Sequence, residues 1–200
     1  MNYGEIKHNL TSLVFGETSD LEEVEDLGYL YDSVNRALSE IEVFFPYVAK
    51  YEFDIDEADA NDGENIYIDM SDLPGYLGLA DTPVLYEKDG ETLYKRFSAF
   101  EIEDEHTIVI DPVGHVGSYR IMYKCHCSTI TSTTPDTFVP EIPLKAHHLI
   151  PILAAYWLWL DDDEQKATQY RNLYEQDRDE IRVKDKATRI KITPDKWGVI

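Results

Sequence analysis

The chain has 200 residues, of which 43% are hydrophobic, and its 18 Lys and Arg against 40 Asp and Glu give a net charge of −22. This length fits one domain, or one domain with a large insertion, and the apolar fraction is enough for a sizeable core. Because binding to nucleic-acid phosphates requires cations that release counterions, a chain this acidic is not expected to wrap DNA. Its charge suits a channel along which DNA slides, a mimic of DNA, or simple solubility.

The chain has two cysteines, Cys125 and Cys127. They are too few and too close together for a secreted disulfide scaffold, which favours a reducing cytoplasm as the folding compartment. The N-terminus has no apolar signal region, and no apolar run reaches the length of a membrane span. The longest run, Leu149 to Leu160, contains Pro151 and is interpreted as a buried helix. We therefore expect no membrane association.

Two helices are predicted first in chain order. One covers Tyr3 to Phe15 and ends at Gly16. The second has an N-cap at Ser19 or Asp20, runs to about Phe45 and is stopped by Pro46. Its apolar residues recur at helical spacing, at Val24, Leu27, Tyr31, Val34, Leu38, Ile41 and Phe45.

From residue 47 the apolar period changes from 3.6 to 2, which is typical of strands. Asp89-Gly90 suits a two-residue hairpin turn between two of these strands. The polar stretch Ser128 to Asp136 has the composition of a linker. The predicted strands are Val48–Ile55, Asn65–Met70, Val84–Lys88, Thr92–Arg96, His106–Asp111 and Tyr119 to about Ile130.

Residues Pro140 to Ile181 are predicted to form one long amphipathic helix that pairs with the helix over residues 21–45. Whether it starts at Pro143 or afresh at Pro151 stays open, because a proline fits a first helical turn but kinks a helix interior. The residues expected in the helix-bundle interface are Leu149, Leu153, Tyr156, Trp157, Leu160, Tyr170 and Tyr174.

The C-terminus reverses the charge of the chain. Six basic and two acidic side chains give residues 182–200 a net charge of +4, so the rest carries −26. A basic segment with an aromatic near its end is typical of a docking arm for an acidic surface. The sequence does not identify the protein that carries this acidic surface, and an identical neighbouring subunit is one candidate. The expected anchors are Lys186, Arg189, Lys191 and Trp197.

These patterns together predict an α+β fold. Helices from both ends of the chain form a bundle, and a large antiparallel β-rich insert separates them. The predicted parts are residues 1–46 (bundle, first part), 47–140 (insert), 141–184 (bundle, long helix) and 185–200 (extended basic arm).

The candidate metal sites are weak. Cys125-His126-Cys127 offers two thiols on one face of a strand, but a structural zinc site needs four ligands, and His147 and His148 would have to join by coincidence. The acidic loop over residues 54–64 fails as a calcium loop, since aligning Gly63 with the invariant loop glycine puts alanines at two ligand positions.

No other pattern indicates catalysis. Residues 161–164, DDDE, point in different directions on a helix and are interpreted as a solvated stretch. We expect no catalytic, metal or cofactor site. The 14 tyrosines and three tryptophans indicate a thick core or, as we favour, a subunit interface.

The chain resembles the head-tail connector, or adaptor, proteins of tailed bacteriophages. The resemblance rests on YGEIKHNLTSLVFG, LYDSVNRALSEIEVFFP and the segment VPEIPLKAHHLIPILAAYWLWLDDDEQKATQYRNLYEQDRDEI. In the middle, IYIDMSDLPGYLGLADTPVLYEKDG is similar to the strand-rich insert of some of these proteins. The insert is large compared with compact, all-helical connectors.

The resemblance implies a structural, non-enzymatic virion protein at the head-tail junction (the neck), made in the host cytoplasm. Its copies would form a ring of roughly twelve beneath the portal protein, in contact with a tail or second neck protein. DNA would pass through the lumen without specific binding, and residues 185–200 would grip the portal or a neighbouring subunit.

Three alternatives stay beside this hypothesis. The net charge also fits an acidic DNA-mimic inhibitor of a host nucleic-acid-binding protein, although such a protein needs no basic tail. Another neck or tail-completion protein would share most of these features. A metal-dependent enzyme would have to use the acidic loop or Cys125, His126 and Cys127.

Overall fold

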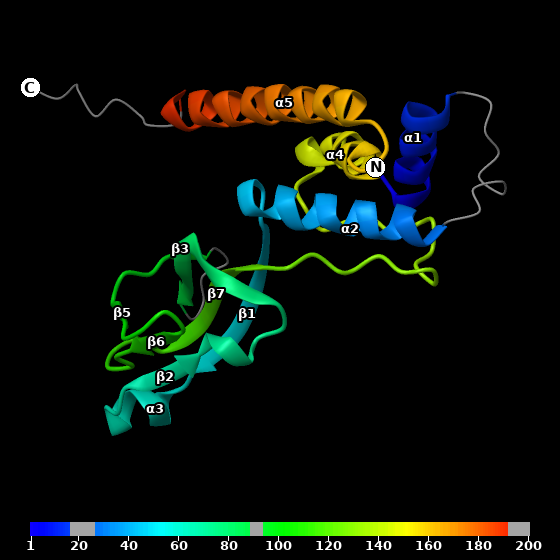
Figure 1. The fold of residues 1–200 in the computed structure, drawn as a ribbon. Coiled ribbons are helices and arrows are strands. Elements are labelled where there is room, and N and C mark those ends of the chain that lie inside the picture. The colour runs from blue at the N-terminus through cyan, green and yellow to red at the C-terminus, as the bar shows by residue number, and fades with distance from the viewer. Residues whose placement is uncertain (17–26, 89–93, 192–200) are drawn as a thin grey trace, which may run out of the picture. The chain divides into compact units, whose positions relative to one another are not determined.

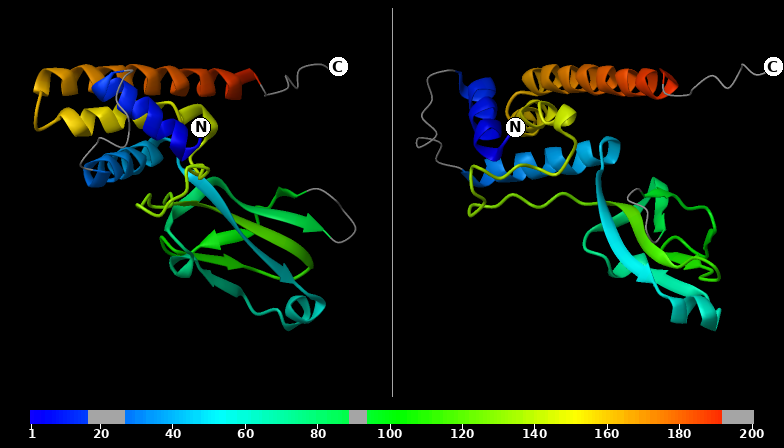
Figure 2. Two further views of the ribbon diagram at one scale, coloured as in Figure 1. Left: turned by 90° about the vertical axis from the view of Figure 1, so that its right-hand side faces the viewer. Right: turned by 180° about the vertical axis from the view of Figure 1, so that it is seen from behind.

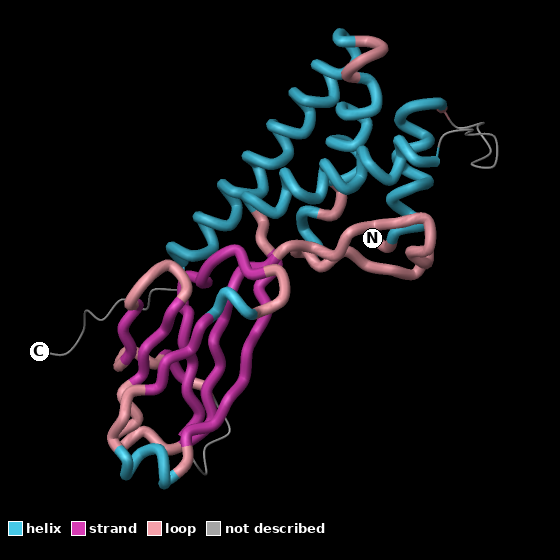
Figure 3. Tube along the Cα trace, turned by 60° about the horizontal axis from the view of Figure 1, so that its bottom comes forward, coloured by secondary structure: helices cyan, strands magenta, loops and turns pink. Residues whose placement is uncertain are grey.

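The computed structural model describes residues 1–16, 27–88 and 94–191. Its contacts divide the chain into two compact units. The helical unit comprises residues 1–45 and 127–200, and the strand unit comprises residues 46–126. Figure 3 shows the helices of the first and the strands of the second in contrasting colours. The predicted α+β fold, with helices from both ends of the chain and antiparallel sheets between them, is confirmed.

Helix α1 spans Tyr3–Phe15, as predicted. The Asn2 side chain accepts a hydrogen bond from the backbone N–H of Glu5, and the Glu5 carboxylate accepts one from the backbone N–H of Asn2, which forms a capping box. Gly16, with φ of 87°, ends the helix, because this conformation is costly for other residues.

Helix α2 spans Leu27–Phe44 and ends before Pro46. The predicted start at Ser19 or Asp20, and Val24 in its apolar stripe, lie outside the described residues. The face that α2 buries consists of Leu30, Val34, Ala37, Leu38, Ile41 and, directly after the helix, Phe45.

The predicted single helix from Pro140 to Ile181 is wrong, because the chain forms two helices and a turn here. A short 3-10 helix, η3 (Leu144–Ala146), leads into α4 (Leu149–Trp159), and α5 follows over Glu164–Lys191. Pro151 falls in the first turn of α4, where no intrahelical bond needs its missing N–H. The start left open by the sequence is therefore near Pro151.

The turn between α4 and α5 is set by the acidic run. The Asp163 carboxylate accepts a hydrogen bond from the backbone N–H of Lys166 at 3.1 Å, which caps the N-terminus of α5. Glu164 then lies in the first turn, where the helix dipole favours a negative charge. Helix α5 therefore folds back along α4 (Figure 1).

Helix α4 is the centre of the helical unit and contacts α1, α2 and α5. Figure 2 shows it between α2 and α5 in both views. It is apolar on nearly every side, as expected of a helix covered all round. Its buried residues are Leu149, Ile150, Pro151, Leu153, Ala154 and Ala155.

The segment after the strand unit packs on the helices rather than on the strands. Asn35 of α2 donates from Nδ2 to the carbonyl of Ile130 and accepts from the Ile130 N–H, both at 2.8 Å. The backbone N–H of Cys127 donates to the Glu42 carboxylate at 2.9 Å. Residues 127–140, which the sequence analysis placed in the insert, thus belong by their contacts to the helical unit.

The strand unit contains two antiparallel sheets, in the orders β1-β7-β3-β4 and β2-β6-β5. Its own core includes Ile55, Val84, Ile108, Tyr119 and Ile121. The strands are β1 (Tyr47–Ile55), β2 (Ile66–Asp69), β3 (Tyr76–Lys88), β4 (Lys95–Arg96), β5 (Phe100–Ile102), β6 (Thr107–Ile110) and β7 (Gly117–Cys125).

The strand unit differs from its prediction in several places. Strand β5 was not predicted, and β7 ends at Cys125 rather than near Ile130. Strand β3 starts at Tyr76 rather than Val84, and its register shifts between Leu79 and Val84. The acidic loop contains a short helix, α3 (Glu57–Asp62), capped by Asp56 and ended by Gly63. A 3-10 turn, η2 (Met70–Asp72), follows β2. The turn at Asp89-Gly90 lies outside the described residues, while β3 and β4 pair as a hairpin does.

The prediction of an extended arm is wrong for residues 185–191. Helix α5 continues to Lys191, so residues 185–191 are helical rather than extended. Residues 192–200 lie outside the described part of the chain.

Candidate functional site

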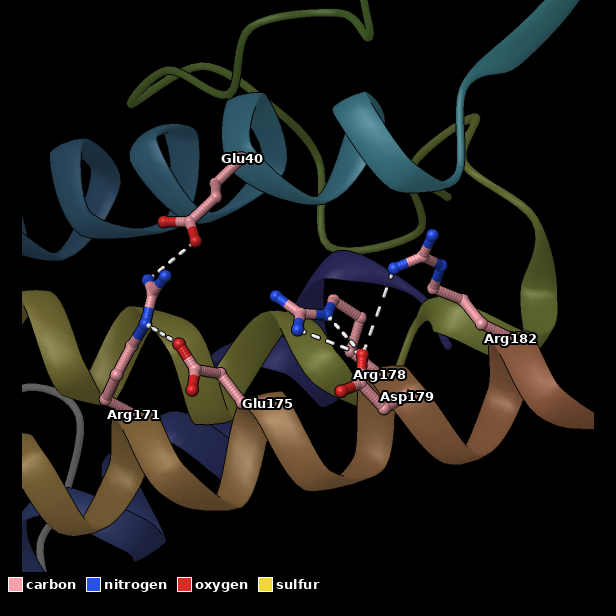
Figure 4. Close-up of polar contacts among 6 residues, drawn as sticks. All are labelled: Glu40, Arg171, Glu175, Arg178, Asp179 and Arg182. Atoms are coloured by element: carbon pink, nitrogen blue, oxygen red, sulfur yellow. Dashed lines mark hydrogen bonds and ion pairs between the residues drawn. The ribbon is translucent and has the colours of Figure 1, made fainter.

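Three arginines of α5 lie on the side toward α2 (Figure 4): Arg171 makes an ion pair with Glu40 of α2, and Arg178 and Arg182 stack on the ring of Phe44. Arg171 is the first. Its Nη1 lies 2.6 Å from Glu40 Oε1 of α2, and its Nε donates to Glu175 Oε1 at 2.9 Å. Its guanidinium also lies 5.5 Å from the centre of the Tyr156 ring and 5.4 Å from that of Tyr174. This one side chain therefore connects α2, α4 and α5.

Arg178 and Arg182 continue the same face of α5. The Arg178 guanidinium lies 4.7 Å from the centre of the Phe44 ring and makes an ion pair with Asp179 at 2.9 Å. Arg182 lies 5.5 Å from the same ring and 4.0 Å from Asp179. We call Arg171, Arg178 and Arg182 the arginine stripe. Stacking on aromatic rings adds to ion pairs that are weak by themselves at a surface.

The arginine stripe changes the electrostatic interpretation of the chain. The Arg171 and Arg178 guanidinium groups are engaged with carboxylates and aromatic rings of the same unit and are mostly covered, so these two do not form an open cationic surface for phosphates, whereas Arg182 stays about half exposed. The sequence analysis missed this role. The available signal was the spacing of seven and four residues, which places all three arginines on one helical face.

The residues predicted in the helix-bundle interface lie in different environments. Leu149, Leu153 and Tyr174 are fully buried in the core of the helical unit, and Tyr156, Trp157 and Tyr170 are partly buried against it. The Tyr170 hydroxyl donates to the Leu13 carbonyl of α1 at 2.6 Å. Leu160 is 36% exposed, because α4 ends at Trp159 and the chain turns away from the core there.

Burial perturbs the tyrosines of both cores. Desolvation raises the pKa of the Tyr3 and Tyr174 hydroxyls in the helical unit and of the Tyr119 hydroxyl in the strand unit. All three side chains are fully buried. Burial therefore favours the neutral phenol at all three positions.

The predicted docking residues are only partly covered by the structure. Lys186, Arg189 and Lys191 belong to the last turns of α5, where the backbone is described. Trp197 lies outside the described residues. Their role as anchors stays a prediction.

A groove of about 500 Å³ lies at one end of the helical unit, where α1 ends, α2 begins and α4 ends. We call it the end groove. Phe15 and Tyr29 on its wall are 52% and 66% exposed. The sequence analysis did not identify it, since its walls come from three separate helices. Its lining includes Phe15, Tyr29, Leu30, Trp157, Leu158 and the acidic Asp32, Asp161 and Asp162.

The candidate metal ligands do not converge. Cys125 is buried in the core of the strand unit, and Cys127 belongs to the other unit. His147 is buried in the helical unit, with Nε2 2.9 Å from the Ile142 carbonyl oxygen. Across residues 1–16, 27–88 and 94–191 no group of three or more His, Cys, Asp or Glu could hold a metal ion. No helix in this described part is long and apolar enough to cross a membrane.

Comparison with known proteins identifies no family for this chain. Neither family models nor curated proteins match the chain. Among solved structures, one described as the neck of an empty GTA particle computed with C6 symmetry is similar, with 15% identity and a TM-score of 0.29. The alignment covers 82% of this chain and 82% of that chain. A TM-score of this size is not evidence for a common fold.

Proposed function

We propose that this chain is a structural subunit of a virion neck, a head-tail connector that forms a ring beneath the portal and around the DNA channel. The observation that carries the proposal is the separation of charge along the chain. Residues 1–181 carry −26, residues 182–200 carry +4, and Arg171 and Arg178 of the body are engaged inside the helical unit. The body then repels DNA, and the C-terminal segment is attracted to acidic protein surfaces.

Two further observations support an assembled subunit. Large apolar side chains are exposed at both ends of α2, including Tyr29, Val43 and Phe44. Exposed apolar residues of this size mark contacts with other chains when they gather in patches. The resemblance of the sequence to connector proteins supports the same function and adds the portal, a tail or second neck protein, and about twelve copies as the expected partners.

The strand unit would be an accessory of this assembly. It has its own core and is joined to the helical unit at residues 45–46 and 126–127. A contact with the tail or with a neighbouring subunit is the role that we assign to it.

The test is a mass measurement of the portal assembly with and without this chain, by mass photometry. We expect the portal of the same phage to gain the mass of roughly a dozen subunits. Truncation after Lys184 removes residues 185–200 with all four expected anchors and is expected to abolish the gain, while the matched control Val183→Ala, at an exposed site on α5, should leave it unchanged. An unchanged portal mass with the full chain would contradict the proposal.

The net charge favours one other function, inhibition of a host nucleic-acid-binding protein by DNA mimicry. This alternative predicts binding of the isolated chain to a basic host enzyme with a strong salt dependence. It also predicts that truncation after Lys184 has no effect on that binding. The same truncation therefore separates the two functions.

A further inference from the structure

We propose that the end groove binds residues 192–200, ITPDKWGVI, of a second copy of this chain, with Trp197 as the anchor. The inference goes beyond the neck function and does not depend on it. It concerns association of the purified protein with itself, and it identifies both surfaces of that contact on one chain.

The end groove, as the described residues form it, has the features of a binding site. Aromatic and aliphatic side chains form its walls, and its volume of about 500 Å³ falls in the range of ligand pockets. An aromatic anchor entering such a groove is the commonest form of interface hot spot.

Charge favours the same occupant. Asp32, Asp161 and Asp162 line the end groove, and the one cation among its described lining residues, Arg36, stacks on Trp157 at 5.5 Å. The proposed occupant carries one Lys and one Asp and has no net side-chain charge, while the last turns of α5 directly before it are basic. Residues 186–197 carry four basic side chains, at Lys186, Arg189, Lys191 and Lys196, against Asp195.

Distance shows that the occupant must come from another copy. The end groove adjoins the start of α5, since Asp161 and Asp162 line it and α5 begins at Glu164. Helix α5 has 28 residues and is therefore about 42 Å long. Residues 192–197 span at most about 20 Å even when fully extended. Trp197 therefore cannot return to the groove of its own chain.

A contact of this kind joins different surfaces of the two copies. Each subunit offers one groove and one C-terminal segment, and these lie at opposite ends of α5. Contacts between unlike surfaces continue from copy to copy and produce either a closed ring or an open filament. Association through the groove is thus expected to continue beyond a dimer.

The first experiment measures binding of a fluorescein-labelled peptide of residues 186–200 to the full-length protein by fluorescence anisotropy. We expect saturable binding. The Trp197→Ala peptide should bind about 30-fold more weakly or worse, as for a hot-spot residue, and Trp197→Phe should recover most of the loss. In the protein, Tyr29→Lys should abolish binding, because it places a cation at the groove. Tyr67→Lys is the matched control, since Tyr67 is equally exposed but lies in the strand unit.

The second experiment tests association in trans by native mass. The wild-type protein is expected to form oligomers as concentration rises, while Tyr29→Lys and Trp197→Ala are each expected to stay monomeric. Mixing the two variants should give only one-to-one dimers. The Trp197→Ala copy keeps an intact groove and the Tyr29→Lys copy keeps an intact segment, so one contact forms and none can follow it.

Several outcomes would overturn the inference. Oligomers of Trp197→Ala equal to the wild type would exclude the C-terminal segment as the occupant. Peptide binding that survives Tyr29→Lys would place the contact elsewhere. No peptide binding and a monomeric wild type at every concentration would mean that the groove is closed to this segment, for example by residues 17–26 of the same chain. A portal that still gains mass in that case would leave the neck function standing.

Discussion

The substitution Asn35→Ala tests whether residues 127–142 are an integral part of the helical unit. The Asn35 side chain makes two hydrogen bonds of 2.8 Å with the backbone of Ile130, and Ile130 is fully buried. Alanine would leave one N–H and one C=O without partners. Each buried backbone group left without a hydrogen bond costs about 1–3 kcal/mol of stability. Water can reach the half-buried position of residue 35 and reduces this cost. We therefore expect a loss of about 2–3 kcal/mol in the free energy of unfolding.

The assay is urea unfolding followed by tryptophan fluorescence. Trp157 and Trp159 belong to the helical unit, and residues 46–126 contain no tryptophan, so the signal does not report on the strand unit. The matched control is Asn172→Ala, at an exposed site on α5, which should change stability by less than about 0.5 kcal/mol. If Asn35→Ala were as stable as the control, the segment after the strand unit would not be part of the core, and our division of the chain would be wrong.

Three further predictions concern the N-cap of α5, the strand unit and the buried tyrosines. Asp163→Ala removes the N-cap of α5 and should cost about 1 kcal/mol in urea unfolding, whereas Asp163→Asn should cost much less. Residues 46–126 expressed alone should give a cooperative thermal transition, because this unit has its own core, and a non-cooperative one would contradict that independence. Burial raises the pKa of Tyr3 and Tyr174, so the unfolded state ionises first as pH increases. Stability of the helical unit should hold below about pH 10 and fall above it; unchanged stability at pH 11 would show these phenols to be accessible.

The sequence correctly predicted the helices and strands whose ends are marked by particular residues nearby. Helix α1 has the predicted bounds because Gly16 marks its end, and α2 ends where Pro46 requires it. Strands β1 and β6 follow from alternation that is uninterrupted by glycine or proline. In each case a local signal and the apolar period agree.

The prediction of one long C-terminal helix was wrong because apolar periodicity does not show where the chain reverses its direction. Ala167 and Tyr174 keep the phase of Leu149 and Leu153, so the apolar stripe looks continuous across the turn. The deciding signal is Asp163 followed by Glu164, a pair that is typical of a helix N-terminus. The sequence analysis interprets the same residues as a solvated stretch. The exposed position of Leu160 has the same cause.

The candidate surfaces were harder to predict than the fold. The arginine stripe depends on Glu40 and Phe44, which are distant in sequence, and the end groove combines the ends of three helices. Both require knowledge of which helix faces pack together. A single sequence gives the face of each helix but not its partner.

The most direct test of the neck function is the number of copies of this chain in a purified virion, with their position. Quantitative mass spectrometry against labelled standards should give about as many copies as the portal protein, and cross-linking should join residues 185–200 to the portal or to another copy of this chain. A virion that lacks the chain, or that holds it in numbers typical of a capsid protein, would contradict the account.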